Sequence, residues 1–171
     1  MVTEQLISKN SGLHLLNDPY KKDDSVLEMR KAFNNKDNLK AIEYAEKILA
    51  NDYVNLRAHT ICAMAYKLVG NEEKAKFHKY VSDGIISSIV YPIGGKDPET
   101  ALTVISVDEE YVILQVLGLK PGKQELLKLN GHYYDLCQVI YPGTNIQLSV
   151  YFCIDAPYNW LQTYNRNGIT R

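Results

Sequence analysis

The feature that most constrains this chain is an abrupt change of composition near residue 90. The first 90 of its 171 residues contain 13 Lys and Arg, 12 Asp and Glu, three glycines and one proline. The last 81 contain 6 Lys and Arg, 8 Asp and Glu, seven glycines and five prolines. Gly and Pro mark turns and are unfavourable inside helices. We therefore expect helices with charged outer faces first, and strands and turns after the cluster 91–95.

These two compositions predict the α+β class. We expect an N-terminal extension at 1–21, a helical region of tetratricopeptide-like hairpins at 22–90, and an α+β region at 91–171. The helical hairpins are expected to pack with a small antiparallel sheet plus helices, because so few helices cannot close a core by themselves.

Apolar residues recur at helical spacing in the first region. Between residues 40 and 49 one face carries Ala41, Ile42, Ala45, Ile48 and Leu49. Such spacing is typical of an amphipathic helix. A second apolar face is expected between 58 and 68, and a third helix after the break at Gly70 and Asn71.

Two positions 34 residues apart, Ala41 and Ala75, each follow a short turn, which is the period of a tetratricopeptide repeat. The chain resembles this repeat over about residues 22–88 through Ala32, Ala41, Ala45, Ala63, Tyr66, Gly70 and Ala75. It departs from it where the usual tryptophan falls on Ser25 and His59, and the usual proline on Tyr53 and Ser87.

The repeat resemblance implies an inner face made by the first helix of each repeat. The candidate partner-binding residues on that face are Arg30, Phe33, Thr60, Met64 and Lys67. In longer arrays this face binds peptides. Here it is either an open groove or a surface covered by the C-terminal half.

The second region alternates strand and turn signals. We expect a short strand at 101–105 and a helix over 110–117 after a Ser106–Glu109 capping box, although the Val, Ile and Tyr content also allows a strand there. Strands at 123–129 and 132–140 flank the Asn-Gly pair at 130–131, a strong hairpin signal. A strand at 146–154 and a last short helix from Asp155 complete the region.

The order of motifs resembles a bacterial family, the domain-of-unknown-function family numbered 4919. The matching segments are 94–101, 104–111, 114, 117–119 and 150–154, and the resemblance spans about residues 20–162. It implies a protein of Gram-negative bacteria, sometimes behind an export signal, and implies no chemistry. The run Gly94-Gly95-Lys96 lacks the spacing of a phosphate loop and is expected to form a turn.

Few side chains are arranged for catalysis. The acidic run 108–110 is expected to stabilise a helix start. Strand alternation places His132 and Asp135 on opposite faces, so they form no dyad. His59 and His78 lie on different helices and could approach each other, but without metal-ligand spacing. We predict no catalytic, cofactor-binding or metal-binding residues, and no cofactor.

The three cysteines, Cys62, Cys137 and Cys153, are expected to be buried free thiols in a reducing compartment. A Cys137–Cys153 disulfide across paired strands is the alternative if the protein is exported. The start of the chain has no signal-peptide pattern, and no apolar run of about 18 residues predicts a transmembrane segment. The expected compartment is the cytoplasm, or the periplasm if a leader was removed.

Tyrosine supplies 13 of the 17 aromatic residues. Eight lie after residue 90, where half-buried positions in a small sheet would account for them. Tyrosine is also enriched at protein interfaces. We therefore add Tyr133, Tyr141 and Tyr158 to the candidate partner-binding residues.

These observations favour a non-enzymatic protein-binding module, in a more specific version an immunity protein that neutralises a bacterial toxin encoded nearby. A net charge of −1 excludes the basic excess that is typical of nucleic-acid binders. Two alternatives come from other classes. One is a small hydrolase or ligand-processing enzyme that uses His132 or the acidic run, and the other is a structural envelope component.

Overall fold

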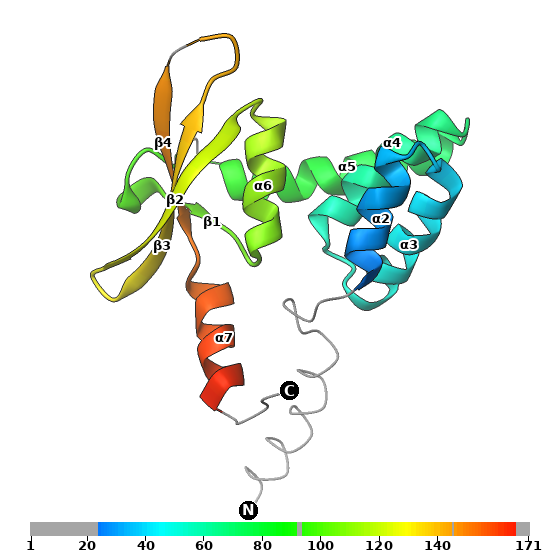
Figure 1. Ribbon diagram of the computed structural model, residues 1–171. Coiled ribbons are helices and arrows are strands. Elements are labelled where there is room, and N and C mark those ends of the chain that lie inside the picture. Colours follow the sequence, from blue (N-terminus) through cyan, green and yellow to red (C-terminus); the bar gives the residue numbers. More distant parts are fainter. Residues whose placement is uncertain (1–23, 92–93, 145, 167–171) are drawn as a thin grey trace, which may run out of the picture. The chain divides into compact units, whose positions relative to one another are not determined.

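The computed structural model describes residues 24–91, 94–144 and 146–166, with the side chains of 164–166 left out. The chain divides into two compact units, with the boundary between Asp83 and Gly84. Helices make up the first unit, and the second contains a sheet with helices (Figure 1). The expected α+β class is therefore confirmed.

The helical unit is built from consecutive helices joined by short turns. They are α2 (Asp24–Asn34), α3 (Asn38–Asn51), α4 (Leu56–Leu68) and α5 (Glu72–Val90), the last of which crosses the unit boundary. The helices expected from the apolar spacing are thus present. Their assignment as tetratricopeptide repeats stays a prediction.

Side-chain caps start three of these helices, with Asn71 accepting from the N–H of Lys74 at the start of α5. The Asp37 carboxylate accepts a hydrogen bond from the backbone N–H of Lys40 at the start of α3. The Asn55 side chain accepts one from the N–H of Ala58 at the start of α4. Each cap satisfies a backbone donor that a helix leaves unpaired, which fixes where the helix begins.

Small side chains fill the centre of the helical core. Fully buried alanines occur on α3 at Ala41 and Ala45 and on α4 at Ala58 and Ala65. Short side chains let helix backbones approach closely, so larger neighbours such as Met29 can fill the space between them.

The second unit contains a four-stranded sheet in the order β1-β4-β3-β2. Its strands are β1 (Leu102–Thr103), β2 (Lys120–Leu129), β3 (His132–Ile140) and β4 (Gln147–Cys153). The three long strands are antiparallel, as expected. The short β1 pairs with β4 in parallel, so the sheet is mixed, a pairing that the sequence analysis missed.

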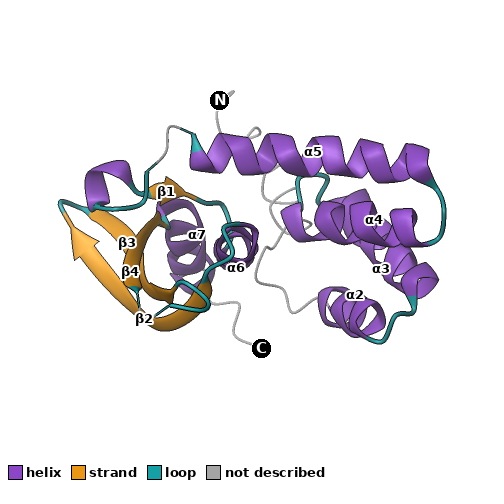
Figure 2. Ribbon diagram, turned by 90° about the horizontal axis from the view of Figure 1, so that it is seen from above, coloured by secondary structure: helices purple, strands orange, loops and turns teal. Residues whose placement is uncertain are grey.

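Helix α6 (Val107–Val116) settles the one ambiguous segment in favour of a helix. The Ser106 hydroxyl caps it by accepting from the N–H of Glu109, and the Glu109 carboxylate accepts from the N–H of Ile105. Figure 2 shows α6 end-on beside the sheet. The helix carries Ile113 and Leu114 into the core, where they are buried.

The chain enters the sheet through a tight turn at the start of the second unit. Asp97 accepts hydrogen bonds from both the N–H and the hydroxyl of Thr100, capping the short helix η1 (Pro98–Thr100). A β-carbon on Gly94 would collide with the Thr100 carbonyl oxygen, so the close approach requires glycine. The segment is the turn that was expected.

Helix α7 (Asp155–Arg166) follows β4. Among the described residues, none of the helices combines the length and the apolar character that a membrane span requires.

All three cysteines are free, so the alternative disulfide is not formed; Cys62 and Cys137 are buried as expected, whereas Cys153 is only half-buried. Cys137 lies opposite Val150 in the β3–β4 register, whereas Cys153 lies opposite Tyr134. The offset of three residues separates the two cysteines by about 10 Å along the strands, beyond the span of a disulfide.

We predict that Gly131→Ala lowers the free energy of unfolding by about 1 kcal/mol. Asn130 and Gly131 both have positive φ, +51° and +87°, as a type I′ hairpin turn requires. A β-carbon strains that conformation, and urea denaturation measures the effect.

Gly84→Ala is the matched control. Gly84 lies in α5 with no neighbour within 4 Å of an added β-carbon, so the same change should stabilise the protein by up to about 1 kcal/mol. Equal effects of the two substitutions would contradict the turn argument.

Candidate functional site

The exposed side of α4 contains three of the predicted partner-binding residues. Met64 is 39% exposed and Lys67 is exposed, while Thr60 is half-buried and donates its hydroxyl to the Leu56 carbonyl. Helical spacing places all three opposite the buried Cys62. The sequence of α4 contains no acidic residue.

Two further predicted residues lie on α2, which contacts α4. Arg30 is exposed, and Phe33 is half-buried and packs against the core of the unit. The predicted residues of the helical region thus come from two neighbouring helices. We call Arg30, Phe33, Thr60, Met64 and Lys67 the α2/α4 surface.

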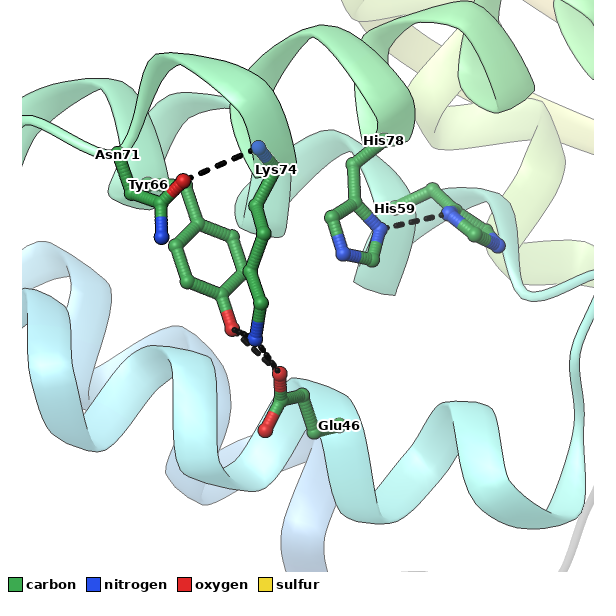
Figure 3. A network of polar contacts seen from close by, with 6 residues as sticks. All are labelled: Glu46, His59, Tyr66, Asn71, Lys74 and His78. Atoms are coloured by element: carbon green, nitrogen blue, oxygen red, sulfur yellow. Dashed lines mark hydrogen bonds and ion pairs between the residues drawn. The ribbon is translucent and has the colours of Figure 1, made fainter.

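A polar network on another side of α4 joins α3, α4 and α5 (Figure 3). The Tyr66 hydroxyl on α4 donates to the Glu46 carboxylate on α3. Lys74 of α5 donates to the Tyr66 oxygen at 2.9 Å and to Glu46 at 3.3 Å. The Tyr66 hydrogen bond, outweighing partial burial, keeps the pKa of Glu46 below its ordinary value. The network fixes α4 against its neighbours.

A buried histidine pair continues this contact between α4 and α5. The Nδ1 atoms of His59 and His78 lie 3.0 Å apart, and His59 Nε2 lies 2.8 Å from the Tyr53 carbonyl oxygen. A carbonyl only accepts, so in neutral His59 the proton is on Nε2 and Nδ1 accepts from His78. The Tyr66 ring stacks on the His78 ring, with the two centroids 5.6 Å apart. The approach that the sequence analysis left open therefore occurs.

No metal is indicated at the histidine pair. Within the part of the chain that the structure describes, no group of three or more His, Cys, Asp or Glu side chains is placed to hold a metal ion. The pair is explained by its own hydrogen bond. Burial first, and His59 second, lower the pKa of His78 below its ordinary value.

In the sheet unit, two of the three predicted tyrosines meet. The rings of Tyr133 and Tyr158 stack with centroids 3.6 Å apart, and the Lys128 ammonium lies 5.0 Å from the Tyr133 centroid. That ammonium lowers the pKa of the Tyr133 phenol. Tyr141 is 51% exposed but follows the far end of β3, about 26 Å from Tyr133. The three tyrosines do not form one surface.

His132 has a carboxylate partner that sequence reasoning missed. As expected, it does not pair with Asp135. Its Nδ1 instead lies 2.6 Å from Asp155 Oδ2, and Asp155 Oδ1 accepts from the N–H of Tyr133 at 2.7 Å. Burial alone would raise the pKa of Asp155, but these bonds outweigh it and the pKa is lowered. Because Asp155 is 23 residues away from His132 in sequence, no local pattern indicated the pair.

The acidic run contains a second missed feature. Glu110 lies in the first turn of α6 like the other two acids, but it is 1% exposed and contacts the sheet. Gln124 Nε2 donates to Glu110 Oε2 at 3.0 Å and to Asp135 Oδ2 at 2.7 Å. We call Glu110, Gln124 and Asp135 the carboxyl cluster.

One sequence signal could have identified the inward direction of Glu110. It precedes Ile113 and Leu114 by three and four residues, and these spacings place side chains on the same helical face. Its partner Asp135 comes from β3, so the sequence alone did not reveal the pair.

The comparison with known families supports the expected relationship. Residues 16–163 match the family described as a domain of unknown function, DUF4919. The chain belongs to this family. No curated protein and no solved structure matches it.

We predict that the stability of the helical unit falls as the pH drops below about 6.5. Unfolded His78 takes up a proton near its ordinary pKa of 6.5, whereas folded His78 does so only at lower pH. The unfolded state therefore binds more protons in this window, which costs up to about 1.4 kcal/mol per pH unit.

His78→Gln tests this dependence, since a glutamine amide can still donate to His59. Urea denaturation at pH 7.5 and pH 5 should show a smaller loss of stability on acidification in the variant than in the natural chain. Identical pH dependences would contradict the assignment to His78.

Proposed function

We propose that this protein is a non-enzymatic protein-binding module that recognises its partner through the α2/α4 surface. The observation that carries the proposal is the exposure of Met64 and Lys67 on α4, together with an exposed Arg30 on the contacting helix α2. The polar network on the other side of α4 fixes this surface before a partner arrives, which lowers the entropic cost of binding.

The chemistry of this surface favours an acidic partner segment with an apolar anchor. Lys67 and Arg30 supply positive charge, and α4 has no acidic residue to oppose it. Met64 supplies an apolar side chain that adapts its shape to a partner. Charged residues around an apolar contact mainly steer encounter and select partners.

In its more specific form, the proposal is an immunity protein that neutralises a bacterial toxin encoded nearby. The stacked Tyr133 and Tyr158 are a second candidate contact for the same partner, because tyrosine rings anchor protein interfaces. The partner is expected in the cytoplasm, or in the periplasm if a leader is removed.

We predict that Lys67→Glu and Met64→Glu each weaken binding of that partner at least about tenfold. Affinity purification from the native host with mass spectrometry identifies the partner, and titration calorimetry then measures each affinity. The charge reversal repels an acidic segment, and a carboxylate at position 64 removes the apolar contact.

Lys76→Glu is the matched control, because Lys76 is exposed on α5 and lies outside the α2/α4 surface. It should leave the affinity unchanged. Partner binding that survives both α4 substitutions would refute the α2/α4 surface. Recovery of envelope proteins, or of further copies of this chain, would favour the structural alternative instead.

A second candidate function, a small hydrolase, is favoured by the pairing of His132 with Asp155. A carboxylate on Nδ1 orients an imidazole and leaves its other nitrogen to take a proton from water, as in catalytic dyads. The His132 side chain is more than half exposed, so this nitrogen is within reach of a ligand.

If the second candidate is correct, the natural chain should hydrolyse an activated ester such as 4-nitrophenyl acetate faster than His132→Ala by about tenfold or more. Asp155→Asn should lower the hydrolysis rate if His132 acts as a base oriented by the carboxylate. It should leave the rate unchanged if His132 is an ordinary surface imidazole. Equal rates for all three proteins would end the enzyme candidate.

A further inference from the structure

The carboxyl cluster brings two acids together at the contact between α6 and the sheet. Glu110 comes from α6 and Asp135 from β3, and both accept from the same Gln124 nitrogen of β2. The shared Gln124 nitrogen therefore holds Glu110 Oε2 and Asp135 Oδ2 side by side. Two carboxylates this close repel each other, and a proton on one of them removes that repulsion.

Glu110 is the group that holds the proton. It is 1% exposed, and its Oε1 atom is buried without a hydrogen-bond partner. Asp135 is half-buried and retains more contact with solvent. An ionised carboxylate needs donors at both oxygens, so the less solvated group is the one that stays neutral.

No cation faces this pair among the described side chains that surround it. The groups that contact Glu110 from β2 and β3 are Gln124, Asp135 and Cys137, whose thiol lies 3.9 Å from Glu110 Oε2. On α6 itself, the Tyr111 hydroxyl donates to Gln124 Oε1 at 3.0 Å. Ionisation of Glu110 would therefore place two carboxylates together with no compensating positive charge.

We propose that α6 is fastened to the sheet through a protonated Glu110 held beside Asp135, so that the attachment of α6 weakens as the pH rises. In the attached state the Glu110 carboxyl keeps its proton. When α6 opens, Glu110 is hydrated and releases this proton to water. Reattachment requires the proton to be taken up again, which becomes harder at higher pH.

The electrostatics of the site agree with this geometry. Burial first, and the charge of Asp135 second, raise the pKa of Glu110 to about 8. Burial likewise raises the pKa of Asp135. Between pH 4.5 and about 8 the attached state binds more protons than the open one, so rising pH favours opening, and the effect levels off above pH 8.

The consequence of opening follows from what α6 covers. Ile113 and Leu114 of α6 are buried, and Val139 and Phe152 are buried on the face of the sheet that carries Asp135 and Cys137. Detachment would expose this apolar surface. This pH-dependent attachment of α6 lies within the sheet unit and does not depend on the α2/α4 surface.

Amide hydrogen exchange of the full chain between pH 5 and pH 9 tests the proposal. After correction for the intrinsic pH dependence of exchange, the protection of α6 should fall by up to about tenfold per pH unit until pH 8 and then level off. In Glu110→Gln the side chain at position 110 is neutral at every pH in this range, so α6 protection should stay constant.

Glu125→Gln is the matched control, because Glu125 is an exposed glutamate on β2 and its change should preserve the natural pH profile. Asp135→Asn removes the second negative charge but leaves Glu110 buried, so the profile should level off at a lower pH than in the natural chain, which keeps the test informative if Glu110→Gln fails to fold. Carbon-13 titration of the natural chain provides a direct check. Ionisation of Glu110 near pH 4.5, or α6 protection that is independent of pH in the natural chain, would overturn the proposal.

Discussion

The close contact of α3 and α4 through small side chains governs the helical unit. Fully buried alanines on both helices let the backbones approach. This approach brings Tyr66 of α4 within reach of Glu46 of α3. On α5, Lys74 and His78 then contact Tyr66 and His59 of α4. Once α4 is fixed on its inner side, Met64 and Lys67 point away from the core, and this is the physical basis for a preformed recognition surface.

The sheet unit depends on a different constraint, the burial of α6. The helix begins at a well-formed cap, and its apolar side chains enter the core. Yet the same face carries Glu110, which costs free energy to bury unless it stays neutral. Gln124 and Asp135 favour the neutral form of Glu110, because a neutral amide and a second acid supply no positive charge to balance a carboxylate there. A helix held by apolar burial together with a titrating contact responds to pH, whereas one held by apolar burial alone does not.

Local signals predicted much of the fold. The helix breaks, the Asn130-Gly131 hairpin, the Ser106 cap and the strand at 132–140 each depend on residues that are neighbours in sequence, and each is present. The parallel pairing of β1 with β4 was missed because two residues of strand give almost no periodicity. The candidate site residues likewise include some that local spacing predicts and some that it does not. The exposed positions on α4 follow from helical spacing, whereas the separation of Tyr141 from Tyr133 depends on the length of β3.

The sequence by itself determined the α+β class, the helix breaks, the Asn130-Gly131 hairpin and the apolar faces of α3 and α4. It could do so because periodicity and turn chemistry act over a few residues. Only the tertiary structure decided which remote side chains meet: His132 with Asp155, Glu110 with Asp135, and Cys137 apart from Cys153. Periodicity indicates that a residue points inward, but strand register and helix packing decide what it meets there, and these depend on contacts between segments far apart in the chain.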